Sequence, residues 1–562
     1  MNSKATNPVL DLDVLRRPAR NAILGSLCLN LLSLATPLYM LVIYDRVMTS
    51  HSEATLATVT FATVLMLALL AVFDLFRNIV FARASATVYA TLEERVYAGC
   101  RRWALAGGSV RRVRPLEDLE AVRSFLASAT PGALIDMIFV PLFVLVLFLI
   151  HPKLGLMTIA LIGVIVALAL INKRAMAKAT DSSVDQFRQA CDFAESHWRQ
   201  VESSLAMGYA SRGEQRAAEA SREAIKAQIL ATSTSGSVTS VIKGIRQGSQ
   251  IMIIAVAAYL ALEGEVTMGA IIASSILFAR ALSPIDQLVG AWRNLFQTRS
   301  SWRRLRELLE TMPEEPERMV LGKARGRLDL VEVVANAPGA QDYILRGVTF
   351  SLPAGESLGV VGPSGSGKST LAKVLLGIWP AARGCARLDG ADIGQMDHDQ
   401  VGPQLGYLPQ AVELLPATVA DNIRRLGPDD PEGVIEAAQM AGAHDMILSL
   451  PEGYDTVIGK RGFALSGGQV QRIGIARALY GKPQLVLLDE PDADLDEAGE
   501  RGLIEAIGAL RTRGATVIII SHRSSLIRPL DKLLVLQAGQ AVQFGPTEQF
   551  DSARQAKVRA VT

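Results

Sequence analysis

Three long apolar runs without a charged residue dominate the first half of the chain. They cover residues 22–44, 56–73 and 154–171. The hydrocarbon core of a bilayer is about 30 Å thick and needs roughly 20 mainly apolar residues of helix. Half of the 562 residues are hydrophobic, and most of the excess precedes residue 290, so we expect a membrane half followed by a soluble half.

Three further runs are weaker candidates for membrane spans. Residues 131–150 carry one charge, Asp136, and residues 266–285 carry Arg280 near their end. Residues 247–262 are the weakest, because their strictly apolar part is short enough for a buried helix of a soluble protein. Hydropathy therefore favours five spans, and parity adds a sixth. The expected spans are 22–44, 56–80, 131–150, 154–172, 247–263 and 266–290.

Lysine and arginine predict the orientation, since cytoplasmic segments carry the excess of both. Four basic residues precede the first run, and eight arginines follow the second expected span (56–80). The turns on the other side contain only Arg46 and Lys153 as basic residues. The N-terminus and the soluble half are therefore expected to be cytoplasmic. The first run is longer than the apolar part of a typical signal peptide, which favours an uncleaved span.

Two long polar segments, residues 82–130 and 173–246, are rich in helix-forming residues and poor in Gly and Pro. We expect them to extend the spanning helices into the cytosol. Long connecting loops are the alternative, and these are uncommon in compact proteins. Glycines near residues 106–114 and 207–213 would let the tips bend and dock on another domain.

Charged side chains also occur near or within the spans: Asp74 with Arg77, Asp136, and Arg280 with Asp286. A helix would place Asp74 and Arg77 on one face, where they can neutralise each other. Intramembrane charges are functional hypotheses by default. Each of these lies near a helix end, where pairing or snorkelling explains it, so a structural role is favoured over substrate contact.

Charge and cysteine content disfavour other classes of protein. The formal net charge of +2 gives no reason to expect nucleic acid as a partner. The four cysteines lie far apart and form no Cys-x-x-Cys pair, which argues against a disulfide framework or a zinc site. They are Cys28, Cys100, Cys191 and Cys385.

The soluble half contains a phosphate-binding loop. Residues 362–370 read Gly-Pro-Ser-Gly-Ser-Gly-Lys-Ser-Thr and match G-x-x-x-x-G-K-[ST], between a β-like run, 357–361, and a helix-like segment, 369–376. Glycines let backbone N–H groups converge on phosphates, and the helix N-terminus favours an anion. Lys368 would contact the β- and γ-phosphates, and the Ser369 hydroxyl would ligate Mg²⁺. A chance glycine-rich turn is the disfavoured alternative.

The apolar stretch 485–488 is typical of a strand buried on both faces of a parallel sheet. It delivers Asp489 and Glu490 to the carboxyl end, where ligands bind in doubly wound sheets. Asp489 would hold the Mg²⁺ shell, and Glu490 would activate the attacking water as general base. His522, after another strand-like stretch, and Gln410 would contact the γ-phosphate. For each of these two alone, a structural role is the alternative.

These motifs, with Leu465-Ser466-Gly467-Gly468-Gln469 among them, make residues 328–550 similar to ATP-binding cassette (ABC) ATPases. The resemblance implies ATP and Mg²⁺ as cofactors, with Ser466 and Gly468 contacting ATP held by a second subunit. One cassette with six spans resembles a half-transporter, which implies a homodimer. Catalysis would then involve Glu490, His522 and Gln410, and metal ligation Ser369, Gln410 and Asp489. Nucleotide contacts would come from Gly362, Pro363, Ser364, Gly365, Ser366, Gly367, Lys368, Ser369, Thr370, Ser466, Gly467, Gly468, Gln469 and Asp496.

Further stretches narrow the resemblance to type I protein secretion exporters, over nearly the whole chain. The stretches that resemble the spans of these exporters are residues 35–47, Asp136 with Pro141-Leu142, residues 151–155 and residues 280–284. Residues 406–410 and 490–496 are similar to the protease-exporter (PrtD-like) branch. The resemblance supports the fifth span. It implies ATP-driven export, across a bacterial inner membrane, of an unfolded or partly folded protein with an uncleaved C-terminal signal. Membrane lipids, a membrane fusion protein and a TolC-like outer-membrane protein would be partners.

The expected fold is therefore a six-helix, all-α transmembrane domain of the ABC exporter type, followed by an α/β P-loop nucleotide-binding domain. Its parts would be a cytoplasmic segment (1–19), the transmembrane domain (20–300), a linker (301–327) and the ATPase domain (328–562). An exporter of lipids, drugs or peptides is the nearest alternative. An ATP-gated channel or regulator is an alternative of a different class.

Three features depart from the family pattern. No peptidase-like domain precedes the first span, so leader-peptide cleavage is not expected. Residues 333–338 lack the aromatic side chain that stacks on adenine in many cassettes, and Tyr343 is a weak substitute, so loose base selectivity is expected. Lys460 stands where exporters commonly carry Glu, which disfavours the usual inter-domain contact there.

Overall fold

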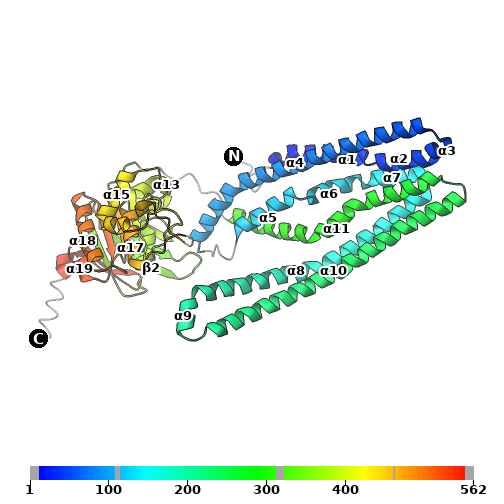
Figure 1. Cartoon of the computed structure of the whole chain (residues 1–562). Helices are drawn as coiled ribbons and strands as arrows, with labels where there is room; N and C mark the ends of the chain where they lie inside the picture. Colours follow the sequence, from blue (N-terminus) through cyan, green and yellow to red (C-terminus); the bar gives the residue numbers. More distant parts are fainter. Residues whose placement is uncertain (1–11, 108–113, 312–321, 460–461, 551–562) are drawn as a thin grey trace. The chain divides into compact units, whose positions relative to one another are not determined.

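The computed structural model describes residues 12–107, 114–311, 322–459 and 462–550 (Figure 1). The chain forms two compact units, one helical and one α/β. The helical unit comprises Met1–Arg101 and Val110–Pro313, and the α/β unit comprises Arg102–Ser109 and Glu314–Thr562. Lys460, most of the first cytosolic tip and much of the expected linker lie outside the described residues.

The helical unit consists of long helices joined by short turns (Figure 1). Large apolar side chains such as Phe61 and Val72 are exposed on α4, as expected for a helix surrounded by lipid. The helices are α1 Leu12–Leu32, α2 Ala35–Val42, the π-helical turn η1 Ile43–Val47, α3 Met48–Ser50, α4 Glu53–Leu105, α5 Pro115–Ala127, α6 Thr130–Asp136, η2 Met137–Phe139, α7 Val140–Ile150, α8 Pro152–Arg199, α9 Val201–Ala206, α10 Ala210–Leu262 and α11 Met268–Thr311.

Within the described residues, five helical segments are long and apolar enough to cross a membrane. They are Arg16–Ser50, Glu53–Leu105, Thr130–Ile150, Ser240–Leu262 and Met268–Trp292. The run expected to be weakest, 247–262, lies in one of them. The fourth expected span is represented by a shorter apolar helix, Pro152–Leu168, because the side chains of residues 169–185 lie outside the described part.

Both polar segments form helices that continue directly from the spans. α4 continues through the first segment as far as Leu105, and α8 and α10 run side by side through the second (Figure 1). The second tip is the short helix α9 followed by a turn at Gly208, whose φ of 71° lies in the left-handed region that favours glycine. α11 continues to Thr311, past the expected start of the linker at residue 301.

A polar cluster joins three helices of the helical unit. Arg77 on α4 pairs with Asp74 and with Asp136 on α6, each at 2.9 Å. Asn30 on α1 donates to Asp136 over 2.9 Å. The expected pairing of Asp74 with Arg77 is confirmed. The cluster lines a polar cavity of about 160 Å³ that Arg280 also borders.

Arg280 and Asp286, the other two charged residues near the end of the last span, do not pair with each other in the described structure. Asp286 pairs with Arg246 on α10 at 3.3 Å. The reason is helical geometry, because residues six apart on α11 point to different faces. Arg280 instead faces the polar cavity.

The α/β unit contains two sheets. Six strands have the order β10-β9-β3-β8-β7-β6, in which β9, β3, β8, β7 and β6 are parallel. Four antiparallel strands have the order β2-β1-β4-β5. The strands are β1 Leu328–Asn336, β2 Tyr343–Leu352, β3 Ser357–Val361, β4 Arg383–Leu388, β5 Ala391–Asp392, β6 Leu405–Leu408, β7 Leu485–Asp489, β8 Thr516–Ile520, β9 Lys532–Gln537 and β10 Gln540–Pro546.

The parallel sheet is packed on both faces, as its continuous apolar strands predict. In β7, Val486 and Leu488 join one buried cluster, whereas Leu485 and Leu487 join the other, because alternate side chains point to opposite faces. Helices α14, α15, α17 and α18 cover the first face, and α12 with the antiparallel sheet covers the second.

The helices of the α/β unit are mostly short. They are α12 Lys368–Leu375, η3 Ile393–Gln395, α13 His398–Val401, η4 Gly402–Gln404, α14 Val419–Ile423, α15 Pro431–Met440, α16 His444–Leu448, η5 Gly453–Asp455, α17 Gly467–Leu479, α18 Glu497–Thr512 and α19 Ser524–Ile527. The membrane all-α plus α/β fold class expected from the sequence is confirmed.

Candidate nucleotide site

Four neighbouring strands bring the predicted site residues to one edge of the parallel sheet. In the order β3-β8-β7-β6, the residues that follow the strands are the phosphate loop, His522, Glu490 and Gln410. Carboxyl ends of parallel strands share one edge of a sheet, where ligands of doubly wound folds bind. The topology therefore collects segments that are up to 160 residues apart in sequence, from 362 to 522.

The phosphate loop has a backbone that only its glycines allow. Gly365 and Gly367 have φ values of 78° and 101°. A Cβ atom on Gly362 would lie 2.1 Å from the carbonyl oxygen of Leu536. α12 begins directly after the loop, at Lys368, so its free N–H groups face the space that the loop surrounds. The geometry of the loop therefore suits a bound phosphate.

Lys368 holds a positive charge inside this loop. Its side chain is buried, and Nζ donates to the carbonyl oxygens of Gly362 at 2.7 Å and Pro363 at 3.1 Å. The hydroxyl of Ser366 is also buried and has no hydrogen-bond partner in the described structure. A buried group of this kind is normally satisfied, so Ser366 suits an incoming phosphate oxygen.

Asp489 provides a free carboxylate oxygen beside the loop. Its Oδ1 is buried without a hydrogen-bond partner among the described residues. Burial raises the pKa of Asp489, and a hydrogen bond from Ser369 opposes that rise. Mg²⁺ prefers oxygen ligands and usually takes one or two carboxylates together with nucleotide phosphates. Asp489 and Ser369 therefore fit a Mg²⁺ ion that binds with ATP.

Glu490 is held by contacts to its side chain and to its backbone. Its φ of 50° is unusual for a residue with a side chain, and such strained positions occur at functional sites. Gln410 Nε2 donates to Glu490 Oε2 over 3.0 Å. The buried Gln471 of α17 donates to the carbonyl oxygens of Glu490 and Pro491, at 3.4 and 3.1 Å. The structure thus joins Gln410 and Glu490, which the sequence placed 80 residues apart.

His522 is exposed at the end of β8, next to anchored neighbours. Ser521 donates to Asp492 over 2.8 Å, and Arg523 pairs with the same carboxylate at 3.0 Å. Because Asp492 follows Glu490 by two residues, these contacts fix the ends of β7 and β8 to each other. The imidazole of His522 is therefore positioned by its neighbours and remains available for ligand.

The residues 465–469 form the N-terminus of α17. Ser466 is the N-cap, and its side chain and that of Gln469 form a reciprocal capping box. The backbones of Gly467 and Gly468 lie against Asp494, which leaves no space for a Cβ atom on Gly468. Within the described residues, no hydrogen bond joins this loop to residues 362–370 of the same chain.

Asp496 is the N-cap of α18 and accepts from the backbone of Gly499 over 2.8 Å. It also pairs with Arg472 of α17. A hydrogen bond from the Gly499 backbone, together with Arg472, holds the pKa of Asp496 below its ordinary value. Asp496, which the resemblance places among the nucleotide contacts, therefore joins α17 to α18 within one chain.

The stretch that lacks an adenine-stacking aromatic residue lies partly in the buried core, and loose base selectivity stays a prediction. Val333 and Ala335 are fully buried in the core and cannot stack on a base. Tyr343 is half exposed at the start of β2. It is the single aromatic residue between 333 and 343.

Comparison with protein families identifies both halves of the chain. The family described as ABC transporter transmembrane region matches residues 20–284, and the ABC transporter family matches residues 345–493. The chain belongs to the ABC transporters. Two family matches of this kind on one chain mean that the ABC ATPase is coupled to transport through a multi-pass membrane domain.

Relatives of this ABC transporter support the assignment over its full length. It is 38% identical to the type I secretion system ATP-binding protein PrsD of Rhizobium meliloti, over 95% of this chain and 93% of the relative. It is 32% identical to the cyclolysin secretion/processing ATP-binding protein CyaB of Bordetella pertussis, over 94% and 75% of the two chains. A solved bacterial Atm1-family ABC exporter with ATP bound matches with a TM-score of 0.83 and 28% identity, covering 97% of both chains.

Sequence motifs did not reveal the residues that hold the site in place. Gln471 binds backbone carbonyls, and Asp492 and Arg523 fix two strand ends. The polar residues Gln471 and Arg472, shortly after the glycines of α17, were a visible signal in the sequence. Gln471 binds the carbonyls, and Arg472 is the partner of Asp496. The local pattern did not indicate that Asp492 and Arg523 contact each other, because this contact depends on the order of strands in the sheet.

Proposed function

We propose that this protein is the ATPase and permease of a bacterial type I secretion system, exporting a protein with a C-terminal signal across the inner membrane. The observation that carries the proposal is the 38% identity with PrsD, which extends over 95% of this chain. Because the similarity covers the membrane spans as well as the ATPase domain, it supports the proposed class of transported substrate and not only ATP hydrolysis.

The proposed assembly is a homodimer with two ATP molecules between the ATPase domains. Each molecule would lie on the phosphate loop of one subunit and contact Ser466 and Gly468 of the other. A membrane fusion protein and a TolC-like outer-membrane protein would complete the duct, and the ATPase domain would face the cytoplasm. The second cytosolic tip exposes Trp198, Leu205 and Met207, which suits a docking surface.

The chain's own residues supply the chemistry of hydrolysis in this proposal. Lys368 and the loop N–H groups bind the β- and γ-phosphates. Ser369, Asp489 and Gln410 would hold Mg²⁺, which neutralises charge on the phosphates when it is bound. Glu490 would take a proton from the attacking water, and His522 would contact the γ-phosphate.

The experiment compares secreted proteins of three strains: one with the intact gene, one lacking it and one carrying Glu490→Gln. We expect specific proteins to disappear from the medium in both altered strains and to accumulate inside the cells. Glu505→Gln, an exposed carboxylate on α18, is the matched control and should secrete normally.

Two outcomes would contradict the proposal. Unchanged secretion, together with altered membrane lipids or altered drug resistance, would favour an exporter of small molecules. The similarity to an Atm1-family exporter is the reason to test this alternative. Continued vesicle flux in Glu490→Gln under saturating ATP would favour an ATP-gated channel.

A further inference from the structure

Arg425 occupies an unusual place between α14 and α15. All five N–H groups of its guanidinium donate to backbone carbonyl oxygens, at distances from 3.0 to 3.3 Å. The acceptors are the carbonyls of Gly402, Leu405, Arg477, Ala478 and Tyr480. A cation whose donors are all used by backbone groups holds these groups in place, since each broken bond would leave a poorly solvated carbonyl.

The five carbonyls lie in or next to two elements that the nucleotide site uses. Arg477, Ala478 and Tyr480 form the C-terminal end of α17, whose first turn carries Ser466. Leu405 is the first residue of β6, whose other end leads to Gln410, and Gly402 begins the short helix η4 directly before β6. The last carbonyls of a helix lack partners within the helix, and a cation there also complements the helix dipole. Arg425 thus joins the far ends of the two elements.

The backbone at this position is strained. Arg425 and Leu426 are consecutive residues with φ values of 57° and 60°, in the region that favours glycine. This conformation follows α14 immediately and turns the Arg425 side chain toward the carbonyls. Strain of this kind persists where the surrounding contacts determine it, and it occurs most often at functional positions. Burial lowers the pKa of Arg425, which agrees with a guanidinium enclosed by protein.

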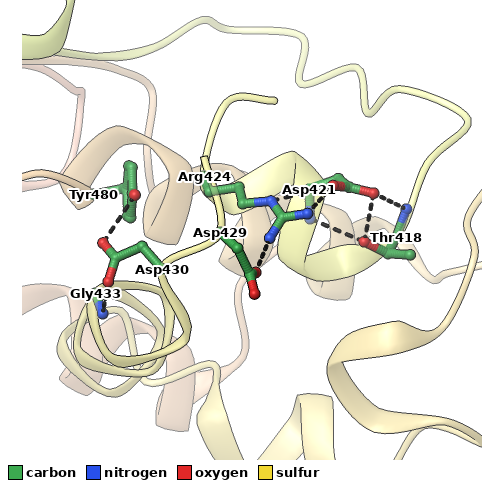
Figure 2. A network of polar contacts seen from close by, with 7 residues as sticks. All are labelled: Thr418, Asp421, Arg424, Asp429, Asp430, Gly433 and Tyr480. Carbon is green, nitrogen blue, oxygen red and sulfur yellow. Dashed lines mark hydrogen bonds and ion pairs between the residues drawn. The ribbon is translucent and has the colours of Figure 1, made fainter. Parts of the chain in front are cut away.

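The adjacent Arg424 makes a different kind of contact. It pairs with Asp421, which also caps α14 with Thr418, and with Asp429 (Figure 2). These partners lie within five residues of it, so Arg424 holds only its own turn. It has the same chemistry and nearly the same place in sequence, and it therefore provides a matched control.

We propose that Arg425 is a positioning residue for ATP hydrolysis. By joining the end of α17 to the start of β6, it makes the Ser466 loop and Gln410 move as one body. In the proposed dimer, the first of these contacts the partner's ATP and the second contacts the ATP of its own subunit. The inference rests on that proposed function, and it adds a link between the two sites within each subunit.

The test uses the purified full-length protein in lipid nanodiscs, as wild type, Arg425→Lys, Arg425→Gln and Arg424→Gln. Binding of the fluorescent analogue TNP-ATP gives the affinity and the number of binding-competent sites, and Mg-ATP turnover gives kcat per competent site. We expect Arg425→Gln to lower kcat about tenfold or more with unchanged nucleotide affinity, because small misplacements of catalytic groups have effects of this size. Arg425→Lys keeps the positive charge but has fewer hydrogen-bond donors, so its kcat should lie between those of the wild type and Arg425→Gln. Arg424→Gln should equal wild type.

Three results would overturn the inference. One is a kcat per competent site equal to wild type in both Arg425 variants. Another is an equal loss in Arg424→Gln. The third is loss of nucleotide binding in parallel with kcat, in the Lys variant as well as the Gln variant, which would make Arg425 a folding residue only. Failure of the wild type to hydrolyse ATP would instead reject the proposed function itself, so the two failures are distinguishable.

Discussion

Asp489 illustrates how a functional carboxylate affects the stability of the protein that carries it. Its side chain is buried and one oxygen has no partner in the described structure, and burial raises its pKa. A carboxyl whose pKa is higher in the folded state favours folding when protonated. It disfavours folding when ionised, so its contribution falls as pH rises through the folded-state pKa. Without Mg²⁺, the ionised form therefore destabilises the protein at pH values above the folded-state pKa.

We predict that Asp489→Asn raises the thermal unfolding midpoint of the nucleotide-free protein at pH 8 while abolishing Mg-dependent ATP hydrolysis. Asparagine keeps the shape and removes the buried charge. The difference in midpoint should shrink as pH falls, because the wild-type carboxyl then becomes protonated. Differential scanning fluorimetry across pH measures it, with the exposed Asp455→Asn as control. A lower midpoint than wild type at every pH would reject this account.

Single residues were predictable where a motif fixes their spacing. Lys368, Ser369 and Asp489 belong to short patterns whose chemistry requires those residue types, and the structure places all three at one edge of the sheet. Arg425 and Gln471 were not predictable, because both bind backbone carbonyls of distant segments. Such contacts leave no pattern of side chains in the sequence.

Among the elements, α1, α4 and α6 are joined by one guanidinium. Arg77 forms ion pairs with Asp74 and Asp136, and Asn30 donates a further hydrogen bond to Asp136. The Arg77 and Asp136 side chains are only 15% and 17% exposed. Removing one partner of such a buried pair leaves an uncompensated charge, whereas removing all charges together does not.

We predict that Arg77→Leu destabilises the helical unit by about 3 kcal/mol or more, the usual effect of breaking a buried pair. The triple variant Asp74→Asn, Arg77→Leu, Asp136→Asn should recover most of the loss. Thermal unfolding in detergent measures both, and the exposed Arg46→Leu serves as control. A triple variant less stable than Arg77→Leu alone would show that the charges themselves hold the helices together.

The presence of long helices followed from hydropathy and composition, but the contacts between helices did not. Asp45, in the π-helical turn η1, accepts from the backbone of Gly269 at 2.9 Å and from Thr267 at 2.6 Å, and so caps α11 from another helix. Its partners lie more than 220 residues away. Neither the π-helical turn nor this cap has a local signal, since both depend on the packing of η1 against α11.

At the scale of the whole molecule, each chain carries one phosphate loop and one Ser466 loop. The latter is capped by its own residues and lies against Asp494. The fold class and the membrane and ATPase halves were predictable, because hydropathy and strand patterns are properties of long segments. The order of strands in the sheet was not, since it depends on crossovers that composition does not encode.

We predict that cysteines at Ser364 and Ser466 form a disulfide between two copies of the chain when ATP is present. In the proposed dimer these positions face each other across one nucleotide. The experiment uses a Glu490→Gln background in which Cys28, Cys100, Cys191 and Cys385, all free in the structure, are replaced by serine. Non-reducing electrophoresis should show a covalent dimer.

The matched control pairs Ser364→Cys with Ser449→Cys, which is exposed elsewhere on the ATPase domain and should leave the chains separate. The double-cysteine variant at Ser364 and Ser466 could also remain monomeric in lipid with ATP, although the protein with an intact Glu490 hydrolyses ATP at the normal rate. That result would rule out a nucleotide shared between two subunits.

The uninterrupted length of α4 and α10 has a mechanical consequence. Each contains 53 residues and therefore measures about 80 Å. A rod of that size works as a lever arm: tilting it by about 3° around one end shifts the other by about 4 Å. A small rotation at one end of the helix thus becomes a displacement of several ångströms at the other end, beyond the thickness of a bilayer. No hydrogen bond inside the helix has to break.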